Sequence, residues 1–178
     1  MRALIEIQAQ PGAARAFYGL HAGRVADVQD PEQLGRVKVS VPSVFGAESA
    51  ESQTWARPCF PVGHFFMPDV DDRVWVAFEH GDPSAPVWLG EWYAAGATPP
   101  EASDLPPAKR VIRTASGHRI LLDDTSGSEK VVLEDAAGSR IELSADGMLL
   151  HAAGDLTIEA PGRTIFLKAA SVDVQSSP

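Results

Sequence analysis

The sequence predicts an all-β protein with two parts, an N-terminal barrel and a C-terminal series of short strands. Three observations lead to this prediction. Short segments that alternate apolar and polar residues recur along the chain, and no segment has a convincing helical period. All four Trp, both Tyr and six of the seven Phe precede Ala94, and Phe166 is the only aromatic residue after it. Residues 94–107 contain four Pro among small residues, which is typical of a domain boundary.

The front part, residues 18–93, contains five predicted strands, which are 19–29, 36–41, 55–59, 73–79 and 87–93. Alternation places three Val on one face of the second strand, and two Val and a Phe on one face of the fourth: Val37, Val39, Val41, Val74, Val76 and Phe78. Five short strands separated by Gly and Pro turns indicate a small antiparallel barrel of the OB type. Residues 1–17 precede this barrel as an arm of ambiguous structure.

The back part, residues 116–175, is a weak repeat that follows a predicted Pro-rich linker, residues 94–115. Six Gly recur at spacings of 7 to 11 residues, and a tail, 176–178, closes the chain. Seven short strands are predicted here, namely 119–122, 130–133, 140–143, 148–150, 156–158, 164–167 and 172–174, and they suggest a β-solenoid. Two medium-sized apolar residues per strand cannot offset the ordering entropy of one chain, so we expect identical chains to share this core around a rotation axis. The predicted core residues are Ile120, Leu122, Val131, Leu133, Ile141, Leu143, Leu156, Ile158, Ile165, Leu167, Val172 and Val174.

Charge and composition exclude several classes of function. The net charge is −9, and residues 1–108 carry 7 Lys and Arg against 14 Asp and Glu, which argues against binding nucleic-acid phosphates or anionic lipid. The single cysteine, Cys59, excludes an internal disulfide framework. We expect no transmembrane helix, because no apolar run reaches the length of about 18 residues that a span needs. The first residues show no secretory signal, so synthesis in the cytoplasm is expected.

The histidines predict no metal or cofactor site within one chain. None of the five is spaced as HxH, HxxxH or HExxH, and Cys59 stands alone. A three-fold axis could bring together three copies of His151 if Leu149 and His151 faced inward. The alternative register, with Met148 and Leu150 inward, is the one we favour.

No catalytic residue is predicted. Three pairs of adjacent carboxylates end strands beside Gly or Ser, where turn and edge roles are expected: Asp71 and Asp72, Asp123 and Asp124, and Glu134 and Asp135. The triplet 116–118, Ser-Gly-His, has no third partner in sequence reach and is best explained as a turn into a strand. Exposed Trp rings could stack bases, as in many OB-folds, but the acidic charge favours structural or protein-contact roles for Trp55, Trp75, Trp88 and Trp92.

The order of these motifs resembles the baseplate spike family, which comprises phage baseplate assembly protein V, VgrG and the spikes of extracellular contractile injection systems. The resemblance covers about residues 18–174, and one of its motifs is a strand ending in an acidic residue that leads into Gly-Asp-Pro and an aromatic strand. The residues that match this motif are Glu79, Gly81, Asp82, Pro83, Pro86, Gly90, Trp92 and Tyr93. Segments 23–25 and 35–39 resemble the first two OB strands, and segments 116–124 and 138–143 resemble the entry to a triple-stranded β-helix.

The resemblance implies a homotrimeric, non-enzymatic needle that punctures membranes and contacts them only during puncture. A VgrG carries a hub region ahead of its OB-fold, whereas only about seventeen residues precede it here, so the stand-alone form with a separate hub protein is expected. The chain ends VDVQSSP without the HxH of an iron-binding tip, which implies a separate PAAR-type tip protein. The particle would be a bacterial phage tail-like assembly that acts extracellularly in some systems, with effector cargo as a further possible partner.

Two other functions remain open from the sequence. One is an OB-fold protein that binds nucleic acid and has a β-rich tail. The other is a β-helical enzyme that acts on polysaccharide through Asp123 and Asp124 or through Glu134 and Asp135.

Overall fold

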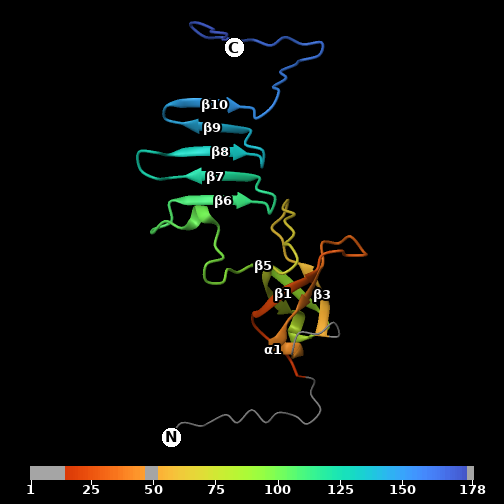
Figure 1. Ribbon diagram of the computed structural model, residues 1–178. Helices are drawn as coiled ribbons and strands as arrows, with labels where there is room; N and C mark the ends of the chain where they lie inside the picture. Colours follow the sequence, from red (N-terminus) through yellow and green to blue (C-terminus); the bar gives the residue numbers. More distant parts are fainter. Residues whose placement is uncertain (1–14, 47–51, 176–178) are drawn as a thin grey trace. The chain divides into compact units, whose positions relative to one another are not determined.

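The computed structural model describes residues 15–46 and 52–175 (Figure 1). Most of the predicted arm and the whole predicted tail lie outside the described residues. The chain divides into two compact units, Met1–Thr98 and Pro99–Pro178. Among the described residues, no helix is long and apolar enough to cross a membrane.

The first unit is a closed barrel with the strand order β1-β2-β3-β5-β4. Its strands are β1 (His21–Asp27), β2 (Val37–Ser40), β3 (Gln53–Pro58), β4 (Arg73–Phe78) and β5 (Pro86–Glu91). Neighbouring strands are antiparallel except β3 and β5, which are parallel, and β4 pairs back with β1 to close the barrel. This is the OB arrangement that the sequence predicts. A short helix, α1 (Pro42–Phe45), follows β2 and was not expected.

The barrel core is made by the alternate residues that the strand pattern placed inward. Six Val side chains are fully buried, namely Val25, Val37, Val39, Val41, Val74 and Val76. Ala56, Phe78 and Trp88 complete the buried core, and the Trp88 indole Nε1 donates a hydrogen bond of 3.3 Å to the carbonyl of Gly35. The barrel therefore buries its apolar residues within one chain.

The second unit is a five-stranded antiparallel sheet in which each strand pairs with the next along the chain. The strands are β6 (Lys109–Arg113), β7 (Arg119–Asp123), β8 (Lys130–Glu134), β9 (Arg140–Ser144) and β10 (Gly147–His151), and Figure 1 shows them stacked in this order. Tight turns connect them, and Gly117 and Gly138 have positive φ in two of these turns. The repeat is thus an antiparallel meander, because each short turn reverses the direction of the chain.

The second unit differs from the expected strand series at both ends. A 3₁₀ helix, η3 (Pro100–Ala102), and the strand β6 lie within residues 94–115, which the sequence predicts to be a linker. Beyond His151 the predicted strands 156–158, 164–167 and 172–174 are not formed. Alternation shows that a segment can be a strand, but a strand also needs a hydrogen-bonding neighbour, which residues 152–175 do not have within one chain.

Candidate interface between chains

One face of the second sheet carries two columns of apolar side chains that are exposed in the single chain. The register places each member directly beside the next across the strands. The first column contains Ile112, Ile120, Leu133, Ile141 and Leu150, and the second contains Leu122, Val131, Leu143 and Met148. All of them are exposed except Ile141, which is half-buried. A continuous apolar surface of this kind indicates an interface, because soluble chains rarely leave one open to water.

The opposite face of the same sheet is already covered by its own side chains. Leu121 is 5% and Val132 is 3% exposed, and both lie in the middle column of this face. Charged residues flank them in the outer columns, where the guanidinium of Arg119 donates to Glu134 Oε2 at 2.6 and 2.8 Å. The long stems of such residues shield the apolar column while their charged ends stay hydrated. This face suits the outside of an assembly.

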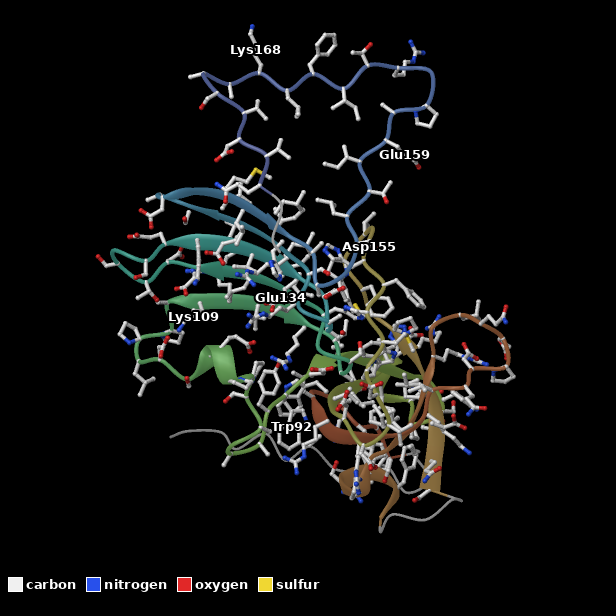
Figure 2. The ribbon with its side chains drawn as sticks, turned by 45° about the horizontal axis from the view of Figure 1, so that its top comes forward. Trp92, Lys109, Glu134, Asp155, Glu159 and Lys168 are labelled. Carbon is white, nitrogen blue, oxygen red and sulfur yellow. The ribbon has the colours of Figure 1, made fainter. Side chains whose placement is uncertain are left out.

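Six of the predicted core residues lie on the exposed apolar face, and six lie beyond the sheet. Those on the face are Ile120, Leu122, Val131, Leu133, Ile141 and Leu143. Those beyond it are exposed and outside any strand: Leu156, Ile158, Ile165, Leu167, Val172 and Val174. Figure 2 shows this segment, which carries Asp155, Glu159 and Lys168, running as an extended chain beyond the sheet.

A groove of about 610 Å³ follows the first apolar column and reaches Leu156. Ile112, Leu133 and Leu150 are among its lining residues, and turn residues such as His118 and Asp135 also line it. Ile112 was missed by the sequence reasoning, since the prolines before β6 hid the start of the strand series. The sequence does contain the pattern that predicts this strand, because 109–113 has the length of the other strands and is followed by the same kind of Gly turn.

The register of β10 places His151 away from the apolar face. Met148 and Leu150 stand beside Leu143 and Ile141, whereas His151 pairs with Arg140 on the covered face. This is the register that we favoured from the sequence. In residues 15–46 and 52–175, no group of three or more His, Cys, Asp or Glu is placed to hold a metal ion.

The adjacent carboxylates hold turns and pair with Arg rather than facing one another. Asp123 accepts hydrogen bonds from the amide and hydroxyl of Thr125, which lower its pKa, and Asp124 pairs with Arg110. Glu134 pairs with Arg119, and Asp135 accepts from the amides of residues 137 and 139 at 2.9 Å. In the pair before β4, Asp71 has a φ of 79° and binds Arg24 at 2.9 Å. Glu134 and Asp135 both line one groove, and Asp71 and Asp72 line another with Glu91, but Glu134 and Asp71 are each paired with an Arg and Asp135 is held by turn amides.

The Ser-Gly-His triplet is a turn. The amide of Thr114 donates to the carbonyl of His118 at 2.9 Å, and Gly117 between them has a φ of 101°. The His118 ring is used structurally, because its Nδ1 accepts a hydrogen bond of 3.2 Å from the amide of Ala136 in the next turn on this edge. This hydrogen bond places the proton of the neutral ring on Nε2, and the hydroxyl of Ser116 lies 3.1 Å from that of Thr114.

The Gly-Asp-Pro motif shapes the connection between β4 and β5. His80 and Gly81 both have positive φ, and the carbonyl of Gly81 accepts a hydrogen bond from the amide of Phe17 at 2.9 Å. Asp82 accepts from the amide and hydroxyl of Ser84, which lowers the pKa of Asp82. Of the other motif positions, Pro86 is buried at the start of β5, Pro83 lies in the turn, and Gly90 lies at the register shift opposite Trp75. These positions therefore build the barrel.

The four Trp have different surroundings. Trp88 is in the core, and Trp55 lies 5.7 Å from the guanidinium of Arg36. Trp75 and Trp92 contact each other on the outside of the barrel, with ring centroids 5.8 Å apart, and the guanidinium of Arg73 covers Trp92. The outer pair is therefore partly occupied by a cation of the same chain, and four acidic residues lie nearby: Asp69, Asp71, Asp72 and Glu91.

Comparison with known proteins assigns each of the two units to a domain family. Residues 21–93 match the type VI secretion system/phage-baseplate injector OB domain. Residues 109–177 match the phage baseplate V C-terminal trimerisation domain. The type VI secretion system spike protein VgrG3 of Vibrio cholerae is 30% identical over 113 residues, a match that spans 57% of this chain and 11% of that relative.

Proposed function

The chain belongs to the baseplate spike family, and from this membership we propose that it is the central, membrane-puncturing spike of a contractile injection system. Its role in the family is structural, as an OB domain joined to a trimerisation domain. The observation that carries the proposal is the exposed pair of apolar columns, since three such faces would close around an axis to form a common core. The chain would be a homotrimer.

In the proposed trimer, β6–β10 of each chain would form one wall of a triangular prism. The two apolar columns would point inward, and the face that carries Arg119 and Glu134 would point outward. Five strands at a spacing of about 4.8 Å give a wall about 20 Å high. The walls would be stiff, because inner strands are hydrogen-bonded on both sides.

Residues 152–175 would extend this prism by pairing with neighbouring copies. The segment keeps the alternation of a strand at Leu156 and Ile158, yet in one chain it has no ladder. The outer edge of β10 and the groove that reaches Leu156 offer it backbone and apolar partners. An intertwined, triple-stranded end would follow.

The other partners in this proposal are a hub protein that seats the barrel, a PAAR-type tip protein and, in some particles, effector cargo. The chain would act within a tail-like particle and contact a membrane only during puncture. Sheath contraction would supply the work, so no catalytic residue is needed.

Mass in solution tests the proposal. Sedimentation equilibrium of the full chain should give three times the chain mass of 19.0 kDa, and melting should depend on protein concentration. A stable monomer with a cooperative melt would refute the trimer. Purification of an intact particle with this chain beside sheath, hub and tip proteins would test the wider role.

A further inference from the structure

Residues 99–108, hereafter the strap, lead into β6, and the helix η3 within them lies on the side of β6 away from β7. The helix η3 contacts β6, and both figures show it beside this strand. The strap contains four Pro, at 99, 100, 106 and 107, and Pro has no amide to donate to a sheet. Although its composition is that of a linker, the strap is attached to the first strand of the sheet.

Glu101 attaches the strap at a point where two cations meet. Arg113 and Arg119 are direct partners across β6 and β7, and like charges in that position destabilise a sheet. The Oε1 atom of Glu101 accepts from Arg113 at 2.8 Å and from Arg119 at 3.1 Å, and the side chain is only 8% exposed. Glu101 thus supplies the negative charge that the sheet itself lacks at this position.

The charge on Glu101 continues a chain of ion pairs over the covered face. Arg119 also binds Glu134 on β8, and Lys109 at the start of β6 binds Asp104 of the strap at 2.5 Å. Burial opposes ionisation of Glu101, but hydrogen bonds from its own backbone amide and from Arg119, together with the charge of Arg113, lower its pKa overall. The hydrogen bond to Asp104 raises the pKa of Lys109. The strap is therefore held to β6 by charge at two points, Glu101 and Asp104. Figure 2 labels Lys109 and Glu134, the two sheet residues between which this network runs.

We propose that the strap is an edge guard: latched by Glu101 between Arg113 and Arg119, it blocks addition of a foreign strand at β6. An open strand edge is a template for pairing with another chain. The latch would leave β10 as the end of the sheet at which strands can be added. The claim about strand addition rests on the proposed function, whereas the latch itself is a property of the single chain.

Proteolysis of the full chain tests the latch. In Glu101→Gln, proteinase K should cut within 99–108 about tenfold faster than in the wild type, because opening of the strap exposes this segment before cleavage. Asp104→Asn should give a smaller acceleration. Glu142→Gln is the matched control, since it removes the same charge from the same face of the sheet, at an ion pair of 3.8 Å with Arg140 that does not include the strap, and it should leave the rate unchanged.

A double-mutant cycle separates the latch from a general loss of stability. In an Arg113→Gln, Arg119→Gln background, Glu101→Gln should add no further acceleration, because its partners are gone. The latch would be overturned if the wild type and Glu101→Gln were cleaved at the same rate, or if the effects of the Glu and Arg substitutions on that rate were fully additive.

The mass of the oligomer provides the second measurement. Glu101→Gln should form species larger than the wild-type oligomer, and an unchanged mass would overturn the edge-guard role. A monomeric wild type would refute the trimer instead, and the cleavage rates would still report on the latch.

Discussion

The two units bury apolar residues in different ways. In the barrel, the strands close on themselves, and six Val side chains have no exposed surface. In the sheet, an equally regular alternation leaves nearly every residue of one face exposed. The barrel can therefore fold as one chain, whereas the sheet has an apolar face that needs partners. The absence of Trp and Tyr from the sheet fits a narrow core shared by several chains.

The largest expected effect comes from a charge on the apolar face. Ile120→Asp should abolish the trimer, because three carboxylates would be buried together near the axis, each at a cost of several kcal/mol. Leu149→Asp is the matched control, since Leu149 is 42% exposed against 43% for Ile120 but lies on the opposite face. Sedimentation equilibrium should give a monomer for the first variant and a trimer for the second. Trimers in both variants would contradict the assignment of the faces.

The barrel should respond differently, because its core belongs to one chain. Trp88→Ala should lower the free energy of unfolding of the barrel by about 3–5 kcal/mol through the cavity that it leaves. Trp75→Ala, on the outer surface, should cost less. Denaturant titrations at several protein concentrations would show the loss in the barrel transition, and oligomerisation should persist. Loss of the trimer in Trp88→Ala would contradict independent folding of the two units.

Much of the barrel was predictable because its partners lie within the printed sequence. The alternation of Val37, Val39 and Val41 corresponds directly to the buried face of β2. The sheet was less predictable, because the partners of its apolar face are not within the sequence of one chain. Alternation identified the face of Ile141, but it could not show that residues 156–174 have no ladder in a single chain. It also could not show that Glu101, remote from its partners in sequence, lies between two Arg side chains.

The pH dependence of the melting temperature should report on Asp30, which lies in the loop that precedes β2. The pKa of Asp30 is far below its ordinary value, chiefly because Arg36 donates hydrogen bonds to it at 2.7 and 3.0 Å. A carboxyl with a lowered pKa stabilises the fold above its unfolded pKa of about 4, and this stabilisation is lost as the pH falls. The melting temperature of the barrel should therefore fall below pH 4. In Asp30→Asn the melting temperature should be lower at pH 7 and its decline on acidification shallower, and an unchanged slope would contradict the role of Asp30.

The smallest effect is expected at Glu142, and a buried residue on the same face makes the comparison informative. Glu142 and Arg140 form a loose ion pair of 3.8 Å on the covered face, so Glu142→Ala should cost less than about 1 kcal/mol. Asp123 is buried on this face and holds the turn through Thr125, so Asp123→Ala should destabilise the sheet more. Thermal unfolding of the two variants at one protein concentration measures the difference. A larger loss from Glu142→Ala would mean that surface charge, rather than the turn, stabilises this face of the sheet.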